Sequence, residues 1–161
     1  MTTSVTVNHS FETGHRLPHL PGKCQSLHGH SWKVEVEITA PNVRADGTVA
    51  MFGDLKRELR AWIDRELDHG LALGLQDELK AFMPKWGKVF VFDPIGELTI
   101  GLAWPTVENM ATLLARVSSQ ILADIDAHEE AVVSRVTVSE TATNTASWKA
   151  PNRAPRFGEE S

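Results

Sequence analysis

Residues 28–39 read HGHSWKVEVEIT, and this segment decides the fold. From 31 to 39 the residues alternate, with Trp32, Val34, Val36 and Ile38 on one face and Lys33, Glu35 and Glu37 on the other. This alternation predicts an antiparallel strand with one buried face. The preceding segment 4–12 is also rich in β-branched residues. We expect segment 4–12 to pair with the strand at 31–39 across a loop, residues 17–27, that carries two prolines and Gly22.

Two helices and two further strands are predicted after this pair. Apolar residues recur at helical spacing within 54–67, and a second helix begins at Pro105-Thr106 and ends near Asp126. Segments 132–140 and 145–149 have the pattern of strands. The order ββααββ predicts an α+β fold in which both helices cover one face of a four-stranded antiparallel sheet. The connection 70–104 lies outside this plan, with a local helix and a strand-like stretch at 89–92.

Length and composition limit the class of protein. A chain of 161 residues, 42% hydrophobic, is long enough for one domain, which we expect over residues 1–150 with 70–104 as a long inserted connection. We expect residues 151–161 to form a polar, mobile tail. The net charge of −5 argues against direct nucleic-acid binding, and apolar stretches broken by charge argue against a membrane span. Residues 1–9 lack the pattern of a secretory signal, so a cytoplasmic location is expected.

The histidines are concentrated in one region: four of the seven lie between residues 15 and 30. Residues two apart on an extended chain point the same way, so His28 and His30 can reach one ion, while Gly29 lets the backbone pass close. His15, at the end of the preceding strand, could supply a third nitrogen. Three protein ligands and an open position are typical of catalytic zinc. A pair of surface histidines in a loop is the alternative for an isolated His-Gly-His.

Cys24 is the only cysteine, so it cannot form a disulfide within the chain. A free thiol beside a cation is pushed toward thiolate, the form that removes a proton or attacks carbon. Four residues before His28, Cys24 is therefore a candidate catalytic thiol. The alternative is that it serves as a fourth, structural ligand of the metal.

Five other polar residues are candidates for function. In Asp68-His69, at the end of the first helix, a carboxylate can orient and charge an imidazole, although such pairs also occur at solvated helix ends. Glu140 has the inward parity of Val136 and Val138, so its carboxylate needs a partner such as a ligand with paired N–H donors. Thr106 and Glu108 fit the cap and first turn of the second helix.

Taken together, these segments resemble the 6-pyruvoyl-tetrahydropterin synthase family. The spacing Cys-x-x-x-His-Gly-His is similar to the bacterial branch, 6-carboxy-5,6,7,8-tetrahydropterin synthase of the queuosine and 7-deazaguanine pathway. An ordered set of short motifs is far more specific than any one of them. The matching segments are FETGHRLP (11–18), GKCQSLHGHS (22–31), FGDLK (52–56), LDH (67–69), PTVEN (105–109) and VSET (138–141).

The resemblance implies a T-fold (tunnelling fold) subunit whose sheets close into a barrel, with two trimers stacked as a homohexamer. It implies that His15, His28 and His30 bind Zn²⁺, and that Cys24, Asp68 and His69 form a catalytic triad assembled across a subunit boundary. Glu140 is implied to grip the amino-pyrimidinone edge of a pterin, which Thr106 and Glu108 also border.

The implied reaction converts 7,8-dihydroneopterin triphosphate to 6-carboxytetrahydropterin with loss of acetaldehyde and triphosphate. Three alternatives are a 6-pyruvoyl-tetrahydropterin synthase, a dihydroneopterin-cleaving enzyme, and a non-catalytic metal- or pterin-binding protein. Cys24 argues against the second, which usually has a carboxylate there, and the retained triad argues against the third. Two departures from the family are Met51, where an acidic or amide residue is usual, and the long connection 70–104.

Overall fold

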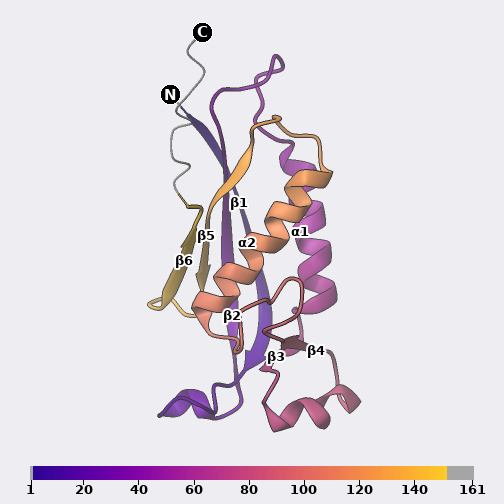
Figure 1. Ribbon diagram of the computed structural model, residues 1–161, viewed down its shortest axis with the longest axis vertical. Coiled ribbons are helices and arrows are strands. Elements are labelled where there is room, and N and C mark those ends of the chain that lie inside the picture. Colours follow the sequence, from indigo (N-terminus) through magenta and orange to yellow (C-terminus); the bar gives the residue numbers. More distant parts are fainter. Residues whose placement is uncertain (1, 152–161) are drawn as a thin grey trace.

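The computed structural model describes residues 2–151 and shows an α+β domain, with two helices packed on a twisted sheet (Figure 1). Of the tail that was predicted to be mobile, residues 152–161 lie outside the described part. Three short 3₁₀ turns, η1 (Lys23–Gln25), η2 (Glu78–Ala81) and η3 (Met83–Lys85), lie in the connections. The main elements are β1 (Thr3–His15), β2 (His28–Ala40), α1 (Phe52–Glu66), β3 (Gly70–Gly74), β4 (Val89–Phe92), α2 (Val107–Asp124), β5 (Val132–Ser139) and β6 (Thr145–Lys149).

The alternating segment forms β2, the long central strand, which pairs antiparallel with β1 on one side and β5 on the other. Trp32, Val34, Val36 and Ile38 are all buried, as the alternation predicted. They face the two helices, whose apolar stripes include Leu59 of α1 and Leu113 of α2. Both helices lie on the same face of the sheet, which confirms the predicted layer order (Figure 1).

The prediction of a four-stranded, purely antiparallel sheet was wrong. The sheet has six strands in the order β4-β3-β1-β2-β5-β6, and β3 runs parallel to both β1 and β4. The two extra strands come from the connection 70–104. Their sequences, GLALG and VFVF, are short apolar runs without alternation, which is the pattern of parallel strands but also of buried loop or helix. The local helix expected in this connection is replaced by η2 and η3.

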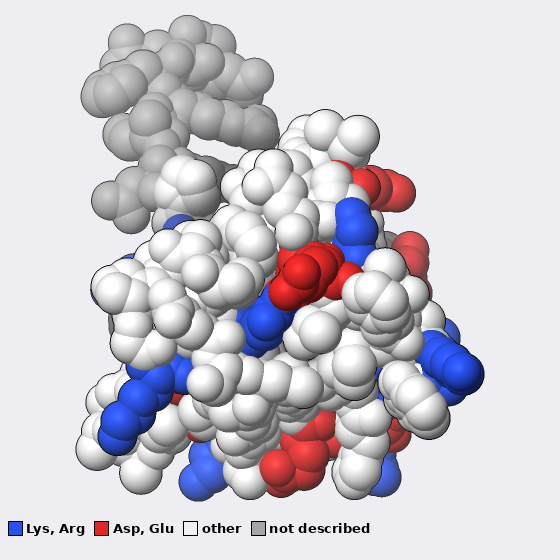
Figure 2. Space-filling view, turned by 90° about the horizontal axis from the view of Figure 1, so that it is seen from below, with Lys and Arg blue, Asp and Glu red and all other residues white. Residues whose placement is uncertain are grey.

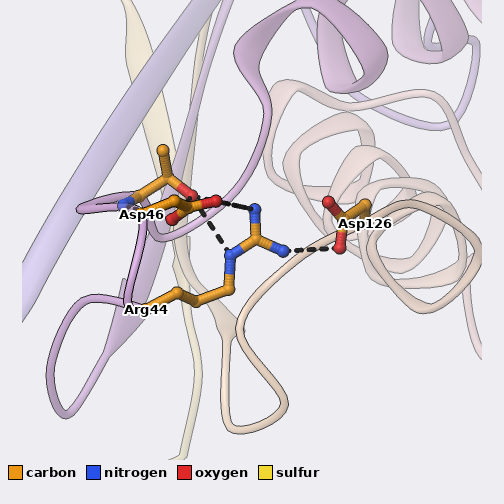
Figure 3. A network of polar contacts seen from close by, with 4 residues as sticks. Arg44, Asp46 and Asp126 are labelled. Atoms are coloured by element: carbon orange, nitrogen blue, oxygen red, sulfur yellow. Dashed lines mark hydrogen bonds and ion pairs between the residues drawn. The ribbon is translucent and has the colours of Figure 1, made fainter.

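The loop after β2 is fixed at the end of the sheet opposite to the histidines. Arg44 pairs with Asp126 at 2.5 Å and with Asp46 at 3.1 Å, which ties this loop to the end of α2 (Figure 3). Thr48 accepts hydrogen bonds from the same guanidinium. This end of the domain is thus closed by polar contacts and carries none of the candidate site residues.

Within residues 2–151, neither helix combines the length and the apolar character required to cross a lipid bilayer.

Candidate functional site

Three histidines meet where β1 ends and β2 begins. The antiparallel register places His15 opposite His28 and Thr13 opposite His30, so all three imidazoles lie on the core-facing side of the sheet. Trp32, fully buried, lies beneath them with its ring centroid 5.1 Å from that of His15 and 5.5 Å from that of His30. Its indole Nε1 donates to the carbonyl oxygen of Thr13 at 2.9 Å. The rings of His15 and His30 therefore pack against a fixed indole on the core side.

Backbone carbonyls determine which nitrogen of two of these rings carries the proton. Nδ1 of His15 is 2.8 Å from the Pro105 oxygen, and Nδ1 of His28 is 2.7 Å from the Ser26 oxygen. Because a carbonyl only accepts, both Nδ1 atoms carry hydrogen, and in the neutral rings both Nε2 atoms carry lone pairs. This is the arrangement by which second-shell carbonyls orient metal-binding histidines.

The lone pairs converge on one point. Nε2 of His15 and Nε2 of His28 are 3.2 Å apart, and Nε2 of His30 is buried without a hydrogen-bond partner among the described residues. One ring nitrogen from each of the three residues lies within 4.8 Å of the others. Facing lone pairs repel each other unless a cation lies between them, so the geometry fits a metal ion held by three imidazoles.

Electrostatics keep these rings in the metal-binding form. Burial lowers the pKa of His15, and its neighbours His28 and His30 lower it further, against the Pro105 hydrogen bond and the charge of Glu140. Burial also lowers the pKa of His30, again opposed by Glu140. Since a metal binds only the neutral imidazole, both ligands are available at neutral pH.

Cys24 lies in η1, within the exposed loop that joins β1 to β2. Its carbonyl oxygen accepts a hydrogen bond of 2.7 Å from the backbone N–H of Leu17, which closes the base of the loop. Among the described residues, the group with converging ligand atoms contains the three histidines and does not include Cys24. Cys24 is therefore close to the histidines in the sequence, but its sulfur is not among the converging atoms that could bind a metal.

Asp68 and His69 form a turn that is anchored to β1. The backbone of His69 adopts φ +55°, a left-handed conformation that L side chains rarely adopt, and its N–H donates to the Glu12 oxygen at 2.7 Å. Asp68 accepts from the Glu12 N–H at 2.8 Å and from Nδ1 of His69 at 2.7 Å. Burial opposes ionisation of Asp68, but these hydrogen bonds lower its pKa, so it is a carboxylate near neutral pH. His69 thereby presents Nε2 to solvent, with its side chain 78% exposed.

Glu140 directly follows β5 and is half-buried. Burial lowers the pKa of His15 and His30, and the negative charge of Glu140 opposes this lowering at both rings. The side-chain amide of Asn144 donates to Oε1 of Glu140 at 3.2 Å. This leaves the second carboxylate oxygen for another donor.

Thr106 and Glu108 have the roles at the start of α2 that the sequence predicted for them. The Thr106 hydroxyl accepts from the Asn109 N–H as an N-cap, and Glu108 is exposed in the first turn. The segment also supplies the Pro105 oxygen to His15, a contact that sequence reasoning missed. No sequence signal marks it, because every residue has a backbone carbonyl.

The end of the molecule that carries the His15 end of β1 is seen in Figure 2. Uncharged side chains make up most of this face, with basic and acidic ones interspersed. A surface hollow of about 540 Å³, lined by residues such as Ser10, Lys33 and Thr137, lies on the opposite face of the sheet. These three residues alternate along their strands with the buried ones, and the lining includes none of the three histidines, so this hollow is separate from the histidine group.

Comparisons with known proteins agree on one family. The family model described as 6-pyruvoyl tetrahydropterin synthase matches residues 4–151. A 6-carboxy-5,6,7,8-tetrahydropterin synthase from Rickettsia bellii is 40% identical over 68 residues, 42% of this chain and 49% of that protein. The protein of the same name from Aquifex aeolicus is 30% identical over 131 residues, 79% of this chain and 76% of that protein.

A solved structure shares the fold. The 6-pyruvoyl tetrahydropterin synthase of Caenorhabditis elegans superposes with a TM-score of 0.61 at 22% identity, covering 94% of this chain and 97% of that one. By contrast, the match to the Rickettsia relative spans only about half of that protein's length.

Proposed function

Because the chain belongs to the 6-pyruvoyl tetrahydropterin synthase family, we propose that it is a zinc-dependent lyase making 6-carboxy-5,6,7,8-tetrahydropterin. The substrate would be 7,8-dihydroneopterin triphosphate, which with one water yields this product, acetaldehyde and triphosphate. The observation that carries the proposal is the convergence of one ring nitrogen from each of three histidines, together with a free thiol in the loop that joins their two strands. The names of the relatives support 6-carboxytetrahydropterin as the product. We further propose that this product serves queuosine or 7-deazaguanine synthesis.

His15, His28 and His30 would hold the metal. Three imidazoles fit zinc with an open fourth position, and the ion when bound supplies positive charge that stabilises oxyanion character on the substrate side chain. The carbonyl oxygens of Pro105 and Ser26 hold two of the ligand rings in the required orientation. This second shell reduces the reorganisation needed for metal binding.

Cys24 and His69 would move protons at the carbons that are rearranged. Asp68 holds Nδ1 of His69 at 2.7 Å, which fixes the tautomer and leaves Nε2 as the proton-transferring atom. Glu140 would accept N–H donors from the amino-pyrimidinone edge of the pterin, a charge-assisted contact. Thr106 and Glu108 would border the same ligand.

We propose that residues 1–150 act as one T-fold domain within a homohexamer of two stacked trimers in the cytoplasm. The outermost strands, β4 and β6, each have one edge that pairs with no strand among residues 2–151. Exposed sheet edges favour pairing with another chain, and closure of a barrel from several copies would remove them. An arrangement of this kind would bring Cys24 of one copy close to Asp68 and His69 of another.

The test is incubation of the purified protein with 7,8-dihydroneopterin triphosphate, followed by mass spectrometry of the products. We expect the mass of 6-carboxytetrahydropterin together with acetaldehyde. Cys24→Ala, prepared in the same way, controls for contaminating enzymes. A product that keeps the three-carbon side chain would instead identify a 6-pyruvoyl-tetrahydropterin synthase, and bound but unchanged pterin would identify a binding protein.

A further inference from the structure

The loop that carries Cys24 has few contacts of its own. Residues 20–27 are all exposed. Within the loop, backbone N–H groups of Gln25 and Ser26 bond only to the neighbouring turn, at Gly22 and Lys23. A segment with so little buried surface opens easily, so its position depends on contacts from outside the loop.

The first outside contact is a buried ion pair at the base of the loop. Arg16 donates to both carboxylate oxygens of Asp77, at 2.8 and 2.7 Å. The Asp77 side chain is 0% exposed, and it also caps η2 by accepting from the Leu79 N–H. Arg16 stands between His15 and Leu17, whose N–H bonds to Cys24. The ion pair thus fixes the backbone between His15, a candidate metal ligand, and the loop that carries Cys24.

The second outside contact is an aromatic stack on one arm of the loop. The rings of His19 and Trp104 lie 4.4 Å apart at an angle of 21°. Trp104 packs directly on Gly74 of β3, where an added Cβ would lie 2.4 Å from its ring, and its carbonyl accepts from the Asn109 side chain. The indole is therefore packed against β3, the backbone of Trp104 is fixed by Asn109, and the ring presents one face to the loop.

Both contacts come from the connection 70–104, the departure from the family pattern that the sequence left without a function. We propose that Asp77 and Trp104 are positioning residues that hold the Cys24 loop in place relative to the histidine group. The connection then serves as a support for the thiol as well as the source of β3 and β4. The catalytic consequence of this support rests on the proposed function, while the support itself is a property of the folded chain.

Hydrogen exchange read by mass spectrometry on the zinc-loaded full chain tests the support directly. In Trp104→Leu and Asp77→Asn, amides of residues 17–26 should exchange at least ~5-fold faster, the scale expected when a stacked or charged contact is lost. Trp86→Leu is the matched control, because Trp86 lies in the same connection but is 74% exposed. It should leave the loop unchanged, and amides of α2 should exchange alike in all variants that fold.

Steady-state kinetics then test whether the position of the Cys24 loop affects catalysis. Trp104→Leu should lower kcat about 10-fold with KM and zinc content unchanged, and Trp104→Phe, which keeps an aromatic face, should restore kcat. His19→Leu removes the same stack from the loop side, so the result does not depend on one variant folding.

Loop exchange that stays at the wild-type rate in Trp104→Leu, His19→Leu and Asp77→Asn would overturn the proposal, whatever the turnover. Faster exchange with unchanged kcat would overturn it as well, because the loop would then not need to be held. If the wild-type protein fails to convert the pterin at all, the proposed function fails, and the exchange rates still decide whether the connection supports the loop.

Discussion

At the scale of single residues, the proposed metal site rests on two ring nitrogens, of His15 and His28, that face each other as lone-pair donors. Nε2 of His15 and Nε2 of His28 are 3.2 Å apart, and each ring donates a hydrogen bond from Nδ1 to a backbone carbonyl. The sequence predicted these ligands from spacing alone. The roles of the Pro105 and Ser26 carbonyls and the packing of Trp32 against the rings could not be predicted, since they depend on which segments lie together in the folded chain.

Removal of one ligand should remove the metal. We expect about one zinc per chain in the wild-type protein and a large loss of zinc in His28→Ala or His30→Ala, because two imidazoles are too few to hold the ion tightly. Elemental analysis of the purified proteins measures this. His128→Ala is the control, since His128 bonds to Asn42 and lies in none of the metal-binding groups among the described residues. Full zinc content in both ligand variants would contradict the assignment.

Cys24→Ala separates a catalytic thiol from a fourth ligand. If the thiol transfers protons, the variant should keep its zinc and its fold but form product at least ~100-fold more slowly, the usual effect of losing a positioned acid or base. Zinc content and product formation are measured on the same preparation. Loss of zinc would point to a structural ligand instead, and unchanged turnover with full zinc would exclude both roles.

Glu140→Gln should weaken pterin binding far more than zinc binding. The substitution keeps the shape of the side chain but removes the charge that accepts N–H donors from the ligand. Titration of the protein with a pterin, alongside zinc analysis, gives both quantities. Equal pterin affinity in the variant and the wild type would refute the assigned role.

At the scale of elements, local sequence patterns predicted the helices and strands that bury one face and expose the other. The alternation in β2, the helical spacing in α1 and the Thr106 cap of α2 each follow from periodicity or side-chain chemistry, and the structure has them close to the predicted bounds. The run 89–92 was predicted to be strand-like, and it forms β4, but its place in the sheet could not be predicted. The run 70–74 gave no such signal, because a strand buried within a sheet need not alternate. The pairing of β3 with the end of β1 is a contact between residues far apart in the sequence, so a local sequence pattern cannot predict it.

The buried pair between Arg16 and Asp77 should make stability depend on pH. Burial opposes ionisation of Asp77, but its bonds to Arg16 and to the Leu79 N–H lower its pKa below 3.8. A lowered pKa means that the carboxylate stabilises the folded state above the unfolded pKa, and that this contribution is lost as the pH falls through the folded value.

Asp77→Asn should therefore lower the free energy of unfolding by ~2 kcal/mol near pH 7, the scale for a hydrogen bond to a charged group. The difference from wild type should shrink below pH 3.8. Urea unfolding from pH 7 down to pH 3 measures it. Glu78→Gln is the control, because Glu78 is 80% exposed and 3.5 Å from Arg16, and it should have little effect at any pH. A difference that is constant across the pH range would contradict the linkage.

At the scale of the whole molecule, the candidate residues come from separate parts of the sequence. β1 and β2 supply the histidines, the turn after α1 supplies Asp68 and His69, and the end of β5 supplies Glu140. The free edges of β4 and β6 and the exposed loop with Cys24 suit a site completed by further copies. Sequence motifs identified the candidate residues, but the order of strands between them came only from the structure.

The most direct test of the central claim is product formation before and after removal of zinc from the same protein. We expect the native protein to convert 7,8-dihydroneopterin triphosphate to 6-carboxytetrahydropterin and acetaldehyde. A chelator should stop the reaction, and stoichiometric zinc should restore it. Conversion that continues at an unchanged rate in the zinc-free protein, or a fully zinc-loaded protein that leaves the substrate intact, would contradict it.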